Sequence, residues 1–127
     1  MKQQIEQVKE WCSAIDVAVP EKFIALSDER MTLRFALMEE ENLEYMTAKS
    51  YAQIADALGD MLYVLVGTIL EHGLHDKIEE VFSEIHRSNM TKVVNGKVKR
   101  RFDGKILKPD TYEKPNIEAI LRGGSNE

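Results

Sequence analysis

The segment from Tyr51 to His72 is apolar on almost every side, and no other feature restricts the possible folds as much. Its apolar side chains recur at three- and four-residue intervals, which predicts one long helix. Ser50 can cap the first turn, and Gly73 suits the C-terminal end. Because a chain of 127 residues supplies only one modest core, we expect a second copy of the chain to cover part of this helix. The apolar positions are Ile54, Ala57, Leu58, Met61, Leu62, Val64, Leu65, Val66, Ile69 and Leu70.

Three more helices are predicted around this segment. Residues 2–15 carry an apolar stripe, and a second helix runs from a cap at Ser27 or Asp28 to about Lys49. A fourth begins at residue 75 or 76 and presents an apolar face as far as Ile85. The expected fold class is therefore all-α.

The chain changes character at about residue 91. Between Thr91 and Lys108, seven lysines and arginines accompany a single aspartate, Asp103. β-Branched residues flank Asn95-Gly96 and Asp103-Gly104, dipeptides that are typical of tight hairpin turns. We predict a small basic β-hairpin over residues 91–108.

A tail of residues 109–127 follows the basic segment. A short helix is expected to begin at Asn116 and to stop at Gly123-Gly124, which leaves a frayed end. With its length and 43% hydrophobic residues, the whole chain, 1–127, is predicted to form one domain.

Charge and cysteine content exclude several classes of protein. The net charge of −5 and pI of about 5.3 argue against a chain that binds nucleic acid through its overall charge. Cys12 is the only cysteine, which excludes an internal disulfide or a multi-cysteine metal site and fits a reducing compartment. The charged N-terminus is unlike a signal peptide, and the longest uncharged run, Met61–Leu70, is half of a membrane span. We expect a cytoplasmic protein without a membrane partner.

Acidic residues occupy positions where apolar ones are expected. Glu40, Glu41 and Glu44 continue the apolar stripe of the second helix, and Asp56 and Asp60 stand one turn apart on the third. Carboxylates at core-facing positions lose hydration and repel one another, so either their pKa values rise or a cation joins them. An all-oxygen set suits Mg²⁺, or Mn²⁺, better than zinc. The alternative is that Glu39–Glu44 is an ordinary solvated acidic face.

The predicted fourth helix turns polar and then positive toward its end. Asn89 and Lys92 continue its inward face, and Lys97, Lys99 and Arg100 follow in the basic segment. An amide and ammonium groups beside a metal–carboxylate site suit phosphate oxygens. Taken singly, Asn89 can equally be a helix C-cap and Lys92 a surface lysine.

The chain resembles the all-α NTP pyrophosphohydrolase superfamily, which includes MazG-like and phosphoribosyl-ATP pyrophosphohydrolase-like proteins. The resemblance rests on RFALMEEENLE, ADALGDMLYVLVGTILEHGL, IHRSNMTK and DGKILKP. The family's Glu-Glu-x-x-Glu signature falls on Glu40, Glu41 and Glu44, and its Glu-x-x-Asp signature places the aspartate on Asp60. The glutamate of that second signature is replaced by Ala57, and Asp56 is the neighbouring carboxylate.

The resemblance implies a four-helix-bundle-type fold completed by oligomerisation, as a homodimer or a dimer of dimers. It also implies Mg²⁺-dependent hydrolysis of a (deoxy)nucleoside triphosphate to the monophosphate and pyrophosphate. Glu41 is the expected proton acceptor besides being a metal ligand, and the basic residues hold the phosphates. Two alternatives remain: a phosphoribosyl-ATP pyrophosphohydrolase, or a non-catalytic helical module whose basic segment binds nucleic acid or an acidic protein.

Overall fold

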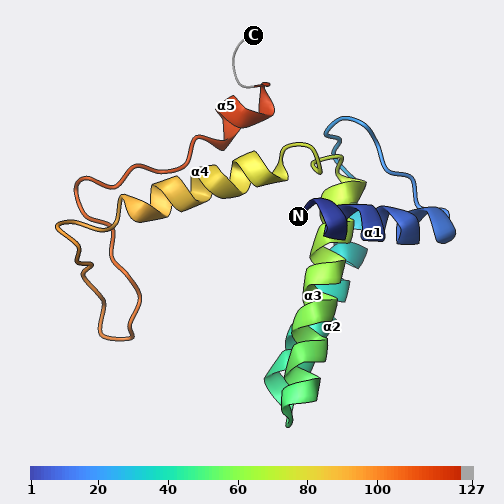
Figure 1. The fold of residues 1–127 in the computed structure, drawn as a ribbon, viewed down its shortest axis with the longest axis horizontal. Coiled ribbons are helices and arrows are strands. Elements are labelled where there is room, and N and C mark those ends of the chain that lie inside the picture. Colours follow the sequence, from blue (N-terminus) through green and yellow to red (C-terminus); the bar gives the residue numbers. More distant parts are fainter. Residues whose placement is uncertain (124–127) are drawn as a thin grey trace. The chain divides into compact units, whose positions relative to one another are not determined.

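The structure is a computed structural model that describes residues 1–123, and within them it contains five α-helices and no β-sheet (Figure 1). The predicted all-α class is confirmed. The chain divides into two compact units, residues 1–76 and 77–127, and the prediction of one domain over 1–127 stays a prediction. The helices are α1 (Lys2–Ala14), α2 (Asp28–Thr47), α3 (Tyr51–Glu71), α4 (Ile78–Met90) and α5 (Ile117–Leu121).

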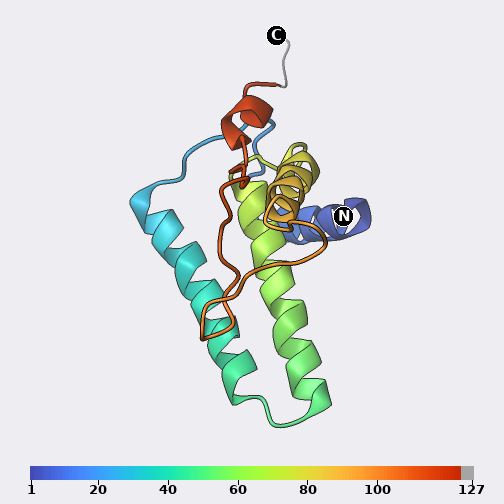
Figure 2. The same cartoon turned by 90° about the vertical axis from the view of Figure 1, so that its left-hand side faces the viewer.

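In the first unit, α2 and α3 form an antiparallel hairpin (Figure 2). Both helices begin at the predicted caps: Ser27 Oγ accepts from the Arg30 amide and Ser50 Oγ from the Gln53 amide, each at 3.1 Å. Gly73, with φ of 72°, follows the end of α3 as predicted. The two serine caps set where each helix starts, and so fix which side chains of α2 and α3 lie at the same level.

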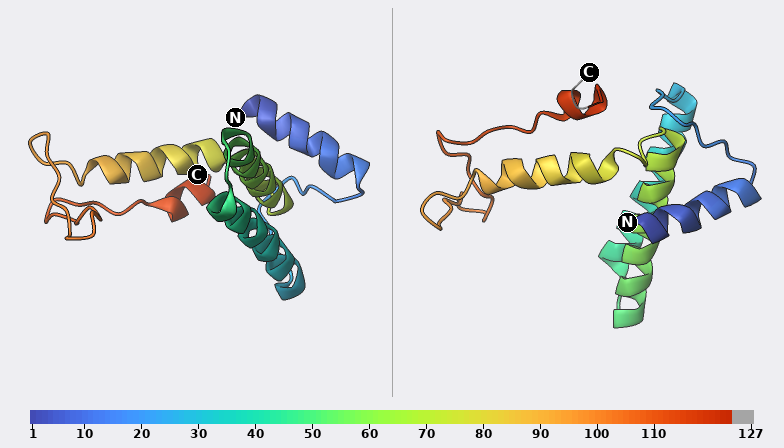
Figure 3. Two further views of the ribbon diagram at one scale, coloured as in Figure 1. Left: turned by 90° about the horizontal axis from the view of Figure 1, so that it is seen from below. Right: turned by 45° about the horizontal axis from the view of Figure 1, so that its top comes forward.

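Helix α1 lies across α3 (Figure 3), and the core of the first unit is mainly where they meet. From the predicted apolar stripe of α1, Ile5, Val8 and Cys12 are buried in this core. Deep in it, Leu70 is fully buried and Val66 is 1% exposed. The buried apolar residues are Ile5, Val8, Cys12, Ala57, Val66, Ile69 and Leu70.

A buried ion pair joins α2 to the end of α3. Glu71 is 5% exposed and accepts from Arg30 Nε at 2.6 Å, while Arg34 Nη1 lies 3.1 Å from the same carboxylate. Arg34 also donates to Thr68 Oγ1 and to the Val64 carbonyl. The two arginines lower the pKa of Glu71, chiefly through the hydrogen bond from Arg30. This network holds the two helices together at the end of the hairpin away from the 48–50 connection.

Much of the apolar surface of α3 stays exposed within this unit. Leu58, Leu62 and Leu65 lie on one face at intervals of four and three residues, and each is more than 40% exposed. By length and composition α3 could also span a membrane, which is weak evidence because the core helix of a soluble protein passes the same test. An exposed apolar stripe of this kind is typical of an interaction surface.

In the second unit, α4 is tied to the C-terminal segment. Ser88 is 1% exposed, and its Oγ donates to the Glu113 carbonyl at 2.7 Å. Glu84 accepts from Arg87 and from the Asn116 amide. The hydrogen bond from Arg87, followed by that from Asn116, lowers the pKa of Glu84 to about 2. α4 begins at Ile78 rather than at residue 75 or 76, because residues 75–77 form a turn.

The predicted β-hairpin of residues 91–108 is reduced to turns. Asn95-Gly96 forms a tight turn with positive φ at both residues, and Val94 and Lys97 exchange two backbone hydrogen bonds. This pair is an isolated β-bridge, and Arg100 and Ile106 form a second one. Among the described residues, no β-strand extends beyond these two bridges. The tight turn at Asn95-Gly96 is therefore confirmed, but the strands of the hairpin are not formed. Two short, exposed and strongly basic segments without a third strand bury too little surface to form a longer run of β-sheet hydrogen bonds. The short helix at Asn116 is confirmed, and Asn116 Oδ1 caps it. Gly123 follows it with positive φ, and Gly124 and the predicted frayed end lie outside the described residues.

Candidate active site

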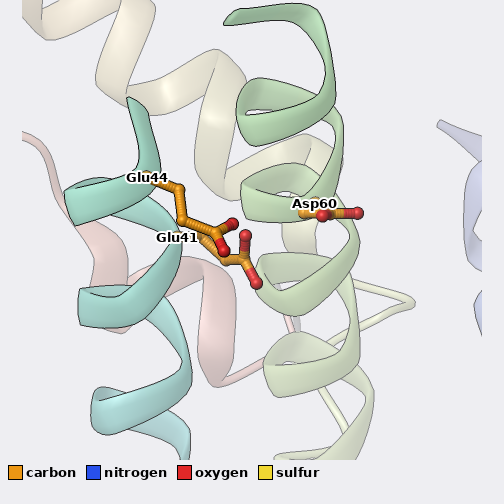
Figure 4. A group of neighbouring side chains, drawn as sticks. All are labelled: Glu41, Glu44 and Asp60. Atoms are coloured by element: carbon orange, nitrogen blue, oxygen red, sulfur yellow. The ribbon is translucent and has the colours of Figure 1, made fainter. Parts of the chain in front are cut away.

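Three of the predicted acids come together between α2 and α3. Glu41 and Glu44 reach from α2 toward α3, which carries Asp60 (Figure 4). One carboxylate oxygen from each residue lies within 4.8 Å of the other two. We call these three residues the acidic trio.

The trio follows from helix periodicity and from the level of the two helices. Glu41 and Glu44 are three residues apart and so share a face of α2. The Ser50 cap starts α3 after a connection of residues 48–50, and Asp60 then stands at the level of that face. The packing of α2 against α3 therefore concentrates negative charge at one place.

Glu41 is the member of the trio whose carboxyl group is partly buried and has a raised pKa. Its Oε1 atom is buried and has no hydrogen-bond partner in the described residues. A hydrogen bond with Glu44 and the loss of hydration raise the pKa of Glu41 to about 7. The charges of Glu44, Asp60 and Glu40 add to this rise. Three converging carboxylates and an orphaned oxygen fit a hard divalent cation.

In the part of the chain that the structure describes, the trio has no positive partner. Within residues 1–123, none of its carboxylates is paired with a lysine, an arginine or a histidine. By contrast, the buried Glu71 has two arginines. The acidic trio therefore differs from a structural ion pair, and a cation from solution would balance it.

The other two predicted acids, Glu40 and Asp56, lie outside the trio. Both are exposed, although the charge of Glu40 still acts on Glu41. The expectation that the acids occupy core positions holds only in part, because Glu41 is partly buried whereas Glu44 and Asp60 are exposed. α2 has no fully buried residue, so its stripe forms only one wall of an open hairpin.

Ala57 stands where the family signature has a glutamate, and it is 2% exposed. It lies one helical turn before Asp60 on α3. The position is therefore turned into the protein, whereas the neighbouring Asp56 is turned to solvent. Asp56 and Ala57 face different directions on one helix, and the structure leaves Asp56 outside the trio.

The residues predicted to hold phosphate lie in the second unit, and three of the five line a pocket. Lys92, Lys97 and Lys99 line one pocket. Asn89 lies outside the pocket lining, but its Oδ1 accepts from Lys92 Nζ at 3.1 Å and so orients that ammonium group. Arg100 donates to the Gly104 carbonyl at 2.9 Å instead, within its own turn.

Two further residues, one in the pocket lining and one in contact with its lysines, were not predicted as site residues. Lys108 lines the pocket, and Tyr112 lies beneath the ammonium groups of both Lys92 and Lys108. Lys108 had a sequence signal, since it belongs to the basic segment. Tyr112 had none, because it follows that segment and contacts Lys92 and Lys108 only through the fold of residues 109–113.

Comparison with known proteins identifies the family. The phosphoribosyl-ATP pyrophosphohydrolase family matches residues 8–89, which is more than half of the chain. The matched range contains the whole acidic trio and ends at Asn89, so the basic segment lies beyond it. No curated protein matches the chain. With two acid-bearing helices in the order and spacing of the superfamily signatures, the chain belongs to the phosphoribosyl-ATP pyrophosphohydrolase family, within the MazG-like all-α NTP pyrophosphohydrolase superfamily.

Proposed function

We propose that the protein is a divalent-metal-dependent pyrophosphohydrolase that cleaves the bond between the α- and β-phosphates of a nucleoside triphosphate group. Water adds across the P–O–P bond, so the products are a monophosphate and pyrophosphate. The observation that carries the proposal is the acidic trio, whose three carboxylates converge without a cation from residues 1–123. The family match supports the reaction class.

Glu41, Glu44 and Asp60 would hold the metal ion, which we take to be Mg²⁺, with Mn²⁺ as a substitute. Bound there, the ion would neutralise phosphate oxygens and lower the pKa of a water molecule. Glu41 also suits the role of proton acceptor, because a carboxyl with a pKa of about 7 exchanges protons readily near neutral pH. Glu40 and Asp56 stay proposals as additional ligands.

The positive residues of the second unit would bind the phosphates. Lys92 is oriented by Asn89, and Lys97 and Lys99 present their charges to the same pocket. Arg100, which donates to a turn carbonyl, is the weakest of the proposed phosphate ligands. Ammonium groups recognise phosphate as point charges, so they need no fixed angle to the oxygens.

Phosphoribosyl-ATP is the substrate that the family match favours. A simple nucleoside or deoxynucleoside triphosphate is the second candidate, because residues 92–111, which form the lysine pocket, extend beyond the matched range. Both substrates carry the same triphosphate group. They differ at the base, and the acidic trio, which would act on the triphosphate group, does not distinguish between them.

A second copy of the chain would cover the exposed face of α3 and give a homodimer or a dimer of dimers. Leu58, Leu62 and Leu65 provide a continuous apolar stripe for such a contact. A reducing cytoplasm is the proposed compartment, in keeping with a single buried thiol at Cys12.

The test is a panel of nucleotides with Mg²⁺, with pyrophosphate and monophosphate measured separately. The panel contains phosphoribosyl-ATP and the canonical and modified ribo- and deoxynucleoside triphosphates. Asp60→Asn is the site variant and Glu39→Gln the control, since Glu39 is an exposed acid of α2 outside the trio. Turnover that Asp60→Asn leaves intact removes the proposed site. No turnover on any substrate favours the non-catalytic module.

A further inference from the structure

The second unit contains a pocket of about 860 Å³ between the 92–99 segment and the 107–111 segment. This volume is typical of small-molecule sites. Val94, Val98, Leu107 and Pro109 give it apolar walls, so it is a hollow rather than a flat charged stripe. Four lysines and one aspartate also line it: Lys92, Lys97, Lys99, Lys108 and Asp110.

Among residues 1–123, the four lysines have no compensating acid. Within the described part of the chain, none of them forms an ion pair, and Asp110 is not paired with any of them. The other basic residue of this segment that has an acid in reach does pair, since Arg101 contacts Asp103. Uncompensated ammonium groups around one concave space attract an anion of high charge density.

Tyr112 brings two of these lysines together. Lys92 Nζ lies 5.7 Å and Lys108 Nζ 5.1 Å from the centroid of its ring. The ring attracts both cations by its negative face, which offsets part of their mutual repulsion. Lys92 lies two residues after the end of α4, whereas Lys108 follows the basic turns, so the ring joins two separate walls of the pocket.

The position of Tyr112 is itself fixed by α4. Ser88 Oγ lies 3.3 Å from the Tyr112 hydroxyl and donates to the neighbouring Glu113 carbonyl. Thr91 Oγ1 accepts from the Glu113 amide at 2.9 Å. Because Ser88 is 1% exposed, this attachment is shielded from water, and the pocket is preorganised before a ligand arrives.

We propose that this pocket is a metal-independent binding site for the phosphate chain of a nucleotide, in which Lys108 is a phosphate ligand and Tyr112 is the positioning residue for Lys92 and Lys108. The identity of the ligand as a nucleotide rests on the proposed function. The charge and shape of the pocket do not rest on it, because all of the pocket residues belong to the second unit, whereas the acidic trio belongs to the first.

The experiment is calorimetric titration of the full chain with inorganic tripolyphosphate in EDTA. Lys108→Gln is expected to weaken binding roughly tenfold, the effect of losing one charge-assisted contact. Lys105→Gln is the matched control, because this substitution removes the same charge from the same segment, but Lys105 does not line the pocket. It should change binding less than about twofold. Tyr112→Leu should weaken binding several-fold, whereas Tyr112→Phe, which keeps the ring, should not.

Several results would overturn the inference. One is no binding by the wild-type chain in EDTA up to about 1 mM tripolyphosphate. Another is an equal loss in Lys105→Gln and Lys108→Gln, which would mean diffuse charge attraction. A third is a single-stranded oligonucleotide that binds more tightly and displaces tripolyphosphate, which would make the pocket part of a nucleic-acid surface.

The outcome is independent of the hydrolysis assay. Glu41→Gln is expected to bind tripolyphosphate in EDTA as the wild type does, because the pocket does not use the acidic trio. A chain that binds tripolyphosphate but hydrolyses no nucleotide refutes the proposed function alone. A chain that hydrolyses nucleotides but does not bind tripolyphosphate refutes this inference alone.

Discussion

Glu41 is the residue of the acidic trio at which we expect the stability of the protein to depend on pH near neutrality. Its pKa is raised from 4.5 to about 7, so folding favours its protonated form. In metal-free protein the stabilisation from this group is complete below about pH 4.5 and is lost as the pH rises through 7. We predict that the melting temperature in EDTA falls between pH 5 and pH 8, and that Glu41→Gln removes this part of the fall.

A divalent ion should reverse that trend. Metal binding needs the ionised carboxylate, so Mg²⁺ should bind more tightly as the pH rises toward 7 and should release a proton below it. The measurement is the rise in melting temperature on adding Mg²⁺ at pH 5.5 and at pH 7.5. An equal rise at both values, or none at either, would contradict metal binding at Glu41.

Replacing Glu41 should remove catalysis without harming the fold. For Glu41→Gln we predict a loss of turnover of roughly 10²- to 10⁴-fold, the usual contribution of a proton acceptor. The melting temperature in EDTA at pH 8 should not fall, because the substitution relieves repulsion from Glu44 and Asp60. Steady-state kinetics beside thermal unfolding tests both, with Glu39→Gln as the control.

At this scale the sequence indicated which type of residue gathers between α2 and α3, but not all of the positions. Helix periodicity placed Glu41 and Glu44 on one face and correctly suggested that Asp60 lies opposite. It could not separate Asp60 from Asp56, since that depends on how α3 is rotated against α2, and this rotation cannot be read from helix periodicity. Tyr112 was missed because its contacts arise from the tertiary fold.

Within α3, residues 56 and 57 differ in direction, and two substitutions separate their roles. Asp56→Asn should change stability by less than about 0.5 kcal/mol and turnover only slightly, since Asp56 is exposed and outside the trio. Ala57→Glu should lower the melting temperature in EDTA, because position 57 is 2% exposed, and Mg²⁺ should restore part of the loss. A loss of turnover in Asp56→Asn as large as in Asp60→Asn would restore Asp56 to the ligand set.

The contact between α2 and α3 depends on a second acid, Glu71. Glu71→Ala should destabilise the protein by about 3 kcal/mol, because it leaves Arg30 and Arg34 without their shared partner. Chemical denaturation measures the change, and Glu80→Ala on the exposed side of α4 is the control. A change below about 0.5 kcal/mol would mean that water replaces the ion pair without cost.

The helices were predictable because their end signals are local. Ser27, Ser50 and Asn116 each accept the amide hydrogen bond expected of a cap. The extent of the β-hairpin was not predictable from local signals. A strand also needs a packing partner that buries one of its faces, and the Asn95-Gly96 turn does not supply that partner. The Arg30 and Arg34 contacts with Glu71 were also not foreseen, because they join residues about forty positions apart.

For the whole molecule, the exposed face of α3 makes self-association the expected state. Size exclusion with light scattering at micromolar concentration should give a dimer or a tetramer. Leu62→Glu should shift the protein toward the monomer, because it places a charge in the middle of the Leu58, Leu62 and Leu65 stripe. Lys49→Glu, an exposed change at the hairpin connection, is the control. A wild-type monomer would contradict this proposal.

The openness of the acidic trio has a consequence for how the protein would acquire its ion. Glu44 and Asp60 are exposed, so water reaches the trio directly and no rigid cage fits one ionic radius. Selection among hard cations requires a closed shell of fixed size, which a half-open pair of helices does not provide. If the trio holds a metal, the cell's supply of free divalent ions, rather than the protein, would decide which element resides there.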